Sequence, residues 1–80
     1  MGEAPLRAAS PLTYRLGQRF RRIREEKGIS LRVLAAGIRV ALFLIRRHEA
    51  GSIMLRTDKL IEAANFMGVP ASTLIDVEGE

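Results

Sequence analysis

The sequence predicts an all-α domain of five short helices, and three observations lead to this fold class. Apolar residues recur at intervals of three and four along several stretches, the spacing of one helical face. Glycines follow these stretches at Gly28, Gly51 and Gly68, and glycine suits the left-handed backbone that ends many helices. No interior stretch alternates apolar and polar residues as a half-buried strand does.

The length and composition limit the classes of protein that this chain can represent. Its 80 residues make one domain with a modest core, and an apolar fraction of 48% is typical of a folded chain. There is no Cys, and one His with nine carboxylates offers little for a metal site, so we expect neither metal nor cofactor. No stretch approaches the ~20 apolar residues of a membrane span, and no secretory signal is recognisable. We therefore expect a cytoplasmic protein without a membrane partner.

The first two helices are indicated by their starts and ends. We expect residues 1–10 to form a mobile arm, residues 11–77 the folded domain and residues 78–80 a tail. Ser10 and Pro11 suit a helix start, so a first helix is predicted over Pro11–Lys27. Its inward stripe comprises Leu12, Leu16, Phe20 and Ile23. Ser30 is the candidate N-cap of a second helix that runs to about Gly37.

Three further helices complete the predicted domain. The third is expected over about Ala41–Ala50 and the fourth over about Thr57–Met67, each closed by a glycine. Val69-Pro70 then opens a last short helix that includes Leu74 and Ile75.

In this order of elements, the chain resembles the lambda-repressor-like helix-turn-helix family, the phage repressor and Cro or XRE type. The resemblance covers about Leu12 to Ile75 and is nearest to a subgroup similar to actinomycete developmental regulators. The residues that carry it are Leu16-Gly17-Gln18-Arg19, Arg24-Glu25-Glu26-Lys27-Gly28-Ile29-Ser30, Leu34-Ala35, Val40, Ile45, Glu49, Gly51, Leu60, Ala64 and Phe66-Met67-Gly68-Val69-Pro70.

The resemblance implies a DNA-binding transcription regulator and no enzymatic activity. In this family the second and third helices form the helix-turn-helix, and the third enters the major groove of double-stranded DNA. A homodimer would bind two-fold related half-sites about one DNA turn apart. Relatives encoded by phages, mobile elements and small operons often regulate their own promoters. The formal charge of +4 favours a polyanionic partner independently of the resemblance.

A helical projection of Ala41–Ala50 selects the candidates for base contact. With Ile45 pointing into the core, Phe43 and Arg47 point almost directly away, and Arg46 lies on the flank. Arginine can grip guanine through two hydrogen bonds, and apolar side chains can contact the thymine methyl group. The candidates are Leu42, Phe43, Arg46 and Arg47. Three roles remain open for Leu42-Phe43-Leu44, namely core packing, DNA contact and a protein interface.

Other residues are candidates for contacts with phosphates or with a second copy of the chain. The phosphate candidates are Arg19, Ser30, Arg32, Arg39 and Arg56. The arginines of the first helix can alternatively be solvated side chains, and Ser30 can be only a cap. The dimer candidates lie in the last helix and the segment before it, where apolar residues exceed the needs of a small core: Phe66, Leu74, Ile75 and Val77.

Several positions depart from the family pattern. The third helix begins with apolar Ala41-Leu42-Phe43-Leu44 where relatives carry polar residues, and Leu31 stands where many have a glutamine that touches phosphate. Arg39 replaces the usual turn glycine. His48 occupies a usual core position, as a packed histidine or else as a ligand or switch. Together with apolar Ile53-Met54-Leu55, these departures keep open an alternative function, a protein-interaction module of antiactivator or antitoxin type that no longer reads DNA.

Overall fold

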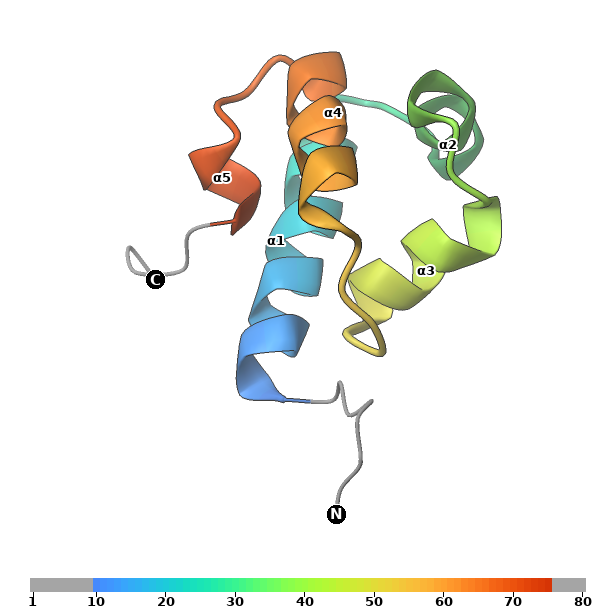
Figure 1. Cartoon of the computed structure of the whole chain (residues 1–80). Helices are drawn as coiled ribbons and strands as arrows, with labels where there is room; N and C mark the ends of the chain where they lie inside the picture. Colours follow the sequence, from blue (N-terminus) through green and yellow to red (C-terminus); the bar gives the residue numbers. More distant parts are fainter. Residues whose placement is uncertain (1–9, 76–80) are drawn as a thin grey trace.

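The computed structural model describes residues 10–75, and in this range the chain forms five α-helices and no strand. The predicted all-α class is therefore confirmed. The predicted arm, apart from Ser10, and the tail lie outside the described residues, as does Val77. The helices are α1 (Pro11–Glu26), α2 (Leu31–Ile38), α3 (Leu42–Ala50), α4 (Thr57–Met67) and α5 (Ser72–Ile75) (Figure 1).

The helix boundaries follow from local capping. The side-chain oxygens of Ser10 and Ser30 accept hydrogen bonds from the backbone amides of Thr13 and Val33, both at 3.1 Å. These bonds satisfy amides that have no partner inside α1 and α2. α3 and α4 end at glycines with φ of 83° and 76°, which close both helices in the left-handed conformation.

The core lies where the five helices converge. α1 packs against α3 and α5, while α2 contacts α3 and α4, and α4 also contacts α5 (Figure 1). The largest side chains that are fully buried there come from all five helices: Leu16, Phe20, Leu34, Ile38, Ile45, His48, Leu60 and Leu74.

One predicted core residue is not buried. Leu12 is 46% exposed although it shares the stripe of Leu16 and Phe20. Leu12 belongs to the first turn of α1, which extends beyond the ends of α4 and α5 in Figure 1. The helical stripe was identified correctly, but its first residue lies past the edge of the core.

α1 and α3 approach each other closely at Gly17. A Cβ atom at this position would overlap the carbonyl oxygen of His48 and lie 2.9 Å from that of Glu49. Only glycine allows this backbone-to-backbone contact, which sets the position of α3 relative to the rest of the domain.

Candidate nucleic-acid interface

α3 presents one face to solvent, and this face carries three of the predicted base-contact residues. Phe43 is 57% exposed, and Arg46 and Arg47 are exposed beside it. The opposite face buries Ile45, His48 and Glu49, as the projection predicts. The helix is therefore held by one side and offers the other to a partner.

The apolar residues at the start of α3 do not share one environment. Two of them pack against the core, and one is exposed to solvent. Leu42 and Leu44 are half-buried and pack against the core cluster. Phe43 alone of the three projects into solvent. Leu42 is therefore placed among packing residues, and it is the least accessible of the four candidates for base contact.

Phe43 and Arg47 contact each other on the exposed face. The central guanidinium carbon of Arg47 lies 5.5 Å from the centroid of the Phe43 ring, within the range of a cation–π interaction. The two residues are one helical turn apart, and long side chains on a helix point back toward its N-terminus. This geometry brings the Arg47 side chain over the ring.

An ion pair between Arg24 of α1 and Glu49 of α3 lies beneath the exposed face. Two hydrogen bonds of 2.6 and 3.0 Å join the guanidinium to the carboxylate, and Arg24 also donates to the backbone oxygen of Ile29 at 2.8 Å. The bond to Glu49 raises the pKa of Arg24 above its ordinary value against the effect of burial. The pair fixes α3 to α1 and to the chain just before α2.

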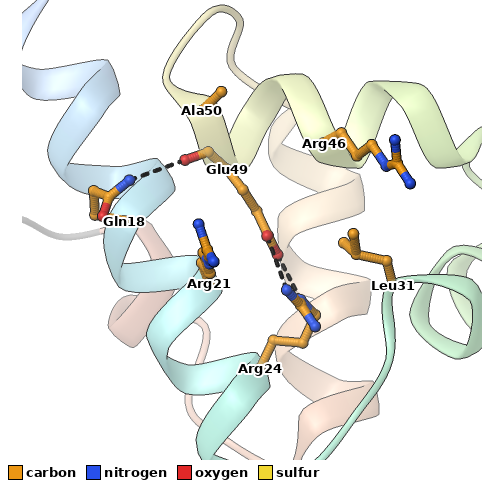
Figure 2. A pocket seen from close by; sticks show the side chains of 7 residues that line it. All are labelled: Gln18, Arg21, Arg24, Leu31, Arg46, Glu49 and Ala50. Carbon is orange, nitrogen blue, oxygen red and sulfur yellow. Dashed lines mark hydrogen bonds and ion pairs between the residues drawn. The ribbon is translucent and has the colours of Figure 1, made fainter.

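A groove of about 310 Å³ opens above this ion pair between α1, α2 and α3. Figure 2 shows Arg21 on its α1 side and Arg46 extending from α3 toward Leu31, the first residue of α2. The remaining lining residues are Gln18, Arg24, Glu49 and Ala50. Arg46 thus lies beside the start of α2 and lines this groove, which Phe43 and Arg47 do not.

Three of the predicted phosphate-contact arginines are exposed. Arg32 lies in the first turn of α2 and Arg39 in the turn that follows this helix. Arg56 precedes α4 and pairs with Asp58 at 2.9 Å, a contact between side chains that are 80% and 53% exposed. Ser30 caps α2, so its predicted alternative as a cap is confirmed.

Arg39 adopts an unusual backbone conformation. Its φ of 58° and ψ of 49° are left-handed, and within residues 10–75 it is the one non-glycine residue with positive φ. This conformation costs an L-residue roughly 1–2 kcal/mol. At this position the chain has a cationic residue, although glycine would adopt the left-handed backbone with less strain.

A second groove of about 320 Å³ adjoins the same turn. Its lining is mostly apolar, and three cationic residues, Arg39, Arg56 and Lys59, also line it. Lys59 is partly engaged because it donates to the backbone oxygen of Ile38 at 3.0 Å and pairs with Glu62 at 3.2 Å. The apolar residues come from α3 and from the segments around it: Val40, Ala41, Leu44, Ile53, Met54 and Leu55.

Arg19 does not belong to the exposed cations, and its prediction as a phosphate contact is wrong. The residue is only 8% exposed, and its guanidinium donates to the backbone oxygen of Thr73 at 3.0 Å. It joins α1 to α5. The cause is its position in α1, which directs the side chain toward the chain that returns at the end of the domain.

The predicted dimer residues within 10–75 differ in exposure. Leu74 is fully buried in the core, so its assignment to an interface is wrong. The Phe66 ring packs so closely over Gly37 of α2 that a Cβ atom at Gly37 would overlap it. Phe66 is 43% exposed. Ile75 is 37% exposed on α5.

Sequence reasoning missed the Arg24–Glu49 pair. The arginines of α1 were interpreted together as solvated or as contacts with DNA, and the first interpretation holds for Arg21, which pairs with Glu25 at 3.0 Å on the surface. A signal for the buried pair was present, because Arg24 follows inward-facing Ile23 and Glu49 lies on the inward side of its own helix.

His48 belongs to the core. It is fully buried, its Nδ1 accepts a hydrogen bond of 3.2 Å from the backbone amide of Leu55, and its ring meets Phe20 edge-on at 4.8 Å. Burial lowers the pKa of His48 to about 4. Of its two predicted roles, the packed histidine fits this environment.

The described part of the chain offers no group of three or more His, Cys, Asp or Glu side chains that could hold a metal ion. Within the same residues, no helix has the length and apolar character needed to cross a membrane. Comparison with models of known protein families gives no match for this chain, and a search of curated proteins gives none either.

Proposed function

We propose that this protein is a sequence-specific DNA-binding transcription regulator in which α2 and α3 form a helix-turn-helix of the lambda-repressor-like type. The observation that carries the proposal is the solvent face of α3, where Phe43, Arg46 and Arg47 are exposed on a helix whose other face is fully anchored. A recognition helix needs this combination, since the side chains must reach base edges while the backbone stays fixed.

The two arginines of α3 have different roles in this proposal. Arg47 stands on the outer face over Phe43 and contacts base edges in the major groove. Arg46 lies in the groove beside Leu31 and contacts the DNA backbone near the start of α2. The arginine takes over the phosphate contact that the polar residue at the position of Leu31 makes in the family. We therefore propose Arg46 as a phosphate contact, whereas the sequence alone predicts a base contact.

The other exposed cations add phosphate contacts on either side of α3. Arg32 and Arg39 lie at the two ends of α2, and Arg56 follows the loop after α3. The excess of cations in the chain, a net charge of +4, supports the same partner. One domain of this size reads few base pairs, so two copies bind two-fold related half-sites.

Binding to DNA selected from a random pool, measured by fluorescence anisotropy at two salt concentrations, tests this function. With six to eight phosphate contacts per pair of protomers, the affinity falls on the order of a thousand-fold or more between about 50 and 200 mM salt. Arg47→Ala should lower the affinity for the selected site more than for random DNA. Arg46→Ala should weaken both equally and make the salt dependence shallower.

Two further variants serve as reference points. Arg39→Gly removes a cation and suits the left-handed backbone, so a loss of affinity cannot be ascribed to misfolding. Arg22→Ala removes an exposed arginine of α1 that lines neither groove, and it should bind as the parent protein does. A salt-insensitive complex, or equal losses in all four variants, would contradict the proposed mechanism.

The second groove favours an alternative function, a protein-interaction module on the same scaffold. Its mostly apolar lining, which includes three cations, suits an acidic partner segment that has an apolar anchor. Under this alternative, Met54→Asp abolishes partner binding, whereas Arg46→Ala combined with Arg47→Ala leaves it intact. Under the proposed function, the double substitution abolishes DNA binding.

A further inference from the structure

The contact between Phe43 and Arg47 indicates which DNA sequence the proposed recognition helix prefers. The Phe43 ring remains 57% exposed while the guanidinium of Arg47 lies 5.5 Å from its centroid. The ring and the guanidinium are therefore both accessible to a partner, and their contact restricts the conformations of both side chains. The inference below rests on the proposed function and adds to it the chemistry of the bases that are read.

A guanidinium that lies over a ring keeps its hydrogen-bonding edge free. When a guanidinium places its face on a ring, its N–H donors lie in the guanidinium plane and stay available to another partner. Two of these donors match the O6 and N7 acceptors of guanine in the major groove. Holding Arg47 over Phe43 before DNA arrives lowers the entropy that this contact loses on binding.

The exposed edge of Phe43 has no hydrogen-bonding group and suits an apolar feature of a base. In the major groove that feature is the C5 methyl group of thymine. Cytosine methylated at C5 carries a methyl group at the same position. Unmodified cytosine has only a hydrogen at C5, and its amino group at C4 is a donor for which an aromatic ring is a poor partner.

The separation of the two groups relates their two target bases. Successive bases on one strand are about 3.4 Å apart along the helix axis. The centres of the two groups are 5.5 Å apart, less than the length of two such steps, so two neighbouring bases suit the pair. We propose that Phe43 and Arg47 act as one unit that reads a methyl-bearing pyrimidine next to a guanine on the same strand of each half-site.

Phe43 then has two effects on recognition. It contacts the pyrimidine methyl group, and it positions Arg47 for the neighbouring guanine. The preference for guanine should therefore weaken when the ring is lost, even if another apolar side chain keeps the methyl contact. Independent contacts would not show this dependence.

Base analogues in the selected half-site test the proposal with the full chain. Uracil in place of thymine removes only the methyl group and should weaken binding by the parent protein about fourfold, the value of one buried methylene. 7-Deazaguanine in place of the adjacent guanine removes the N7 acceptor and should weaken binding about fivefold or more. Arg22→Ala, a matched surface control, should retain both penalties.

Variants of the pair separate the two effects. Phe43→Leu should keep the uracil penalty and lose most of the 7-deazaguanine penalty, because leucine contacts a methyl group but provides no face for the cation. Arg47→Met should lose the 7-deazaguanine penalty, because methionine has no N–H donor for N7, and it should keep the uracil penalty. Circular dichroism of each variant verifies that these exposed substitutions leave the helices folded.

Three results would overturn the inference, and one of them would also overturn the proposed function. Specific binding without either penalty leaves the proposed function standing and removes the assigned bases. A full 7-deazaguanine penalty in Phe43→Leu shows that the residues act independently. Absence of specific DNA binding in the parent protein overturns both the inference and the proposed function.

Discussion

Arg24 and Glu49 form the one ion pair between residues 10 and 75 in which both side chains are about nine-tenths buried, at 10% and 7% exposure. A buried pair recovers its cost of desolvation only when geometry and additional hydrogen bonds are good. Here the pair has two hydrogen bonds, and Arg24 has a third to Ile29. Its value to this protein is the fixed position of α3, because the two residues tie that helix to α1.

We predict that Glu49→Gln lowers the free energy of unfolding by about 3–5 kcal/mol, since it leaves the guanidinium buried without its counter-charge. Urea unfolding followed by circular dichroism measures this loss. Arg21→Met breaks the exposed pair with Glu25 and should cost less than about 1 kcal/mol. A loss in Glu49→Gln as small as that of the exposed pair would show that the buried pair has no special role.

His48 makes stability dependent on pH. Its pKa is lowered from 6.5 to about 4 in the folded protein because burial disfavours the charged ring. Between these values the unfolded chain binds a proton that the folded chain does not. The contribution of His48 to the free energy of unfolding is therefore fully present above pH 6.5. It falls as the pH drops toward about 4, and below that pH it falls no further.

The predicted loss over this window is about 3 kcal/mol, as given by a shift of this size at 1.36 kcal/mol per unit. The free energies of unfolding of the parent protein and of His48→Leu, measured from unfolding curves at several pH values, should therefore converge as the pH falls from 7 to 4. The variant lacks the titrating group but starts lower, because the Leu55 amide loses its acceptor. Parallel pH profiles for the two proteins would contradict the assignment.

Residue contacts across the chain were the least predictable feature. Arg24 lies 25 positions from Glu49, and Arg19 lies 54 positions from Thr73. Helical periodicity gives the direction of each side chain relative to its own helix. It does not specify which distant backbone or carboxylate will meet that side chain. The buried arginines were for this reason grouped with the exposed ones.

The helices themselves were predictable because their signals are local. Ser10 and Ser30 cap α1 and α2 as the sequence indicates, and Gly51 and Gly68 end α3 and α4. The outward face of α3 also followed from its own sequence, because one buried residue, Ile45, fixes the whole projection. By contrast, the grooves beside α3 depend on how three helices meet.

The contact between α1 and α3 can be tested through its glycine. Gly17→Ala would push a methyl group into the backbone oxygen of His48. At Gly37 the nearest atoms to an added methyl group belong to the Phe66 ring, a side chain that can turn aside. Both substitutions gain the same helix propensity. We therefore predict that Gly17→Ala is less stable than Gly37→Ala by about 2 kcal/mol, the typical cost of overpacking.

Thermal and urea unfolding of these two variants measure the difference. The Gly17→Ala protein should also bind DNA more weakly under folding conditions, because a displaced α3 changes the position of Arg47. Equal stability of the two variants would mean that α1 and α3 can separate without cost. The position of α3 would then not be fixed by this contact.

At the scale of the whole molecule, exposed apolar residues are dispersed. The large ones among residues 10–75 come from all five helices and the loop after α3: Leu12, Tyr14, Val33, Phe43, Met54, Ile61, Phe66 and Ile75. A stable interface buries about 1,200–2,000 Å² in total around an apolar centre. Of the dimer candidates in this range, Leu74 is buried, and Phe66 and Ile75 are only 43% and 37% exposed, so little apolar area is left for such a centre.

We therefore predict that the free protein is a monomer at micromolar concentration and that two copies assemble only on a two-fold related DNA site. Light scattering should give the mass of one chain without DNA. With a full site the complex should contain two chains, and with a half-site one. A mass of two chains in the absence of DNA would contradict this prediction and point to an interface that the described residues do not form.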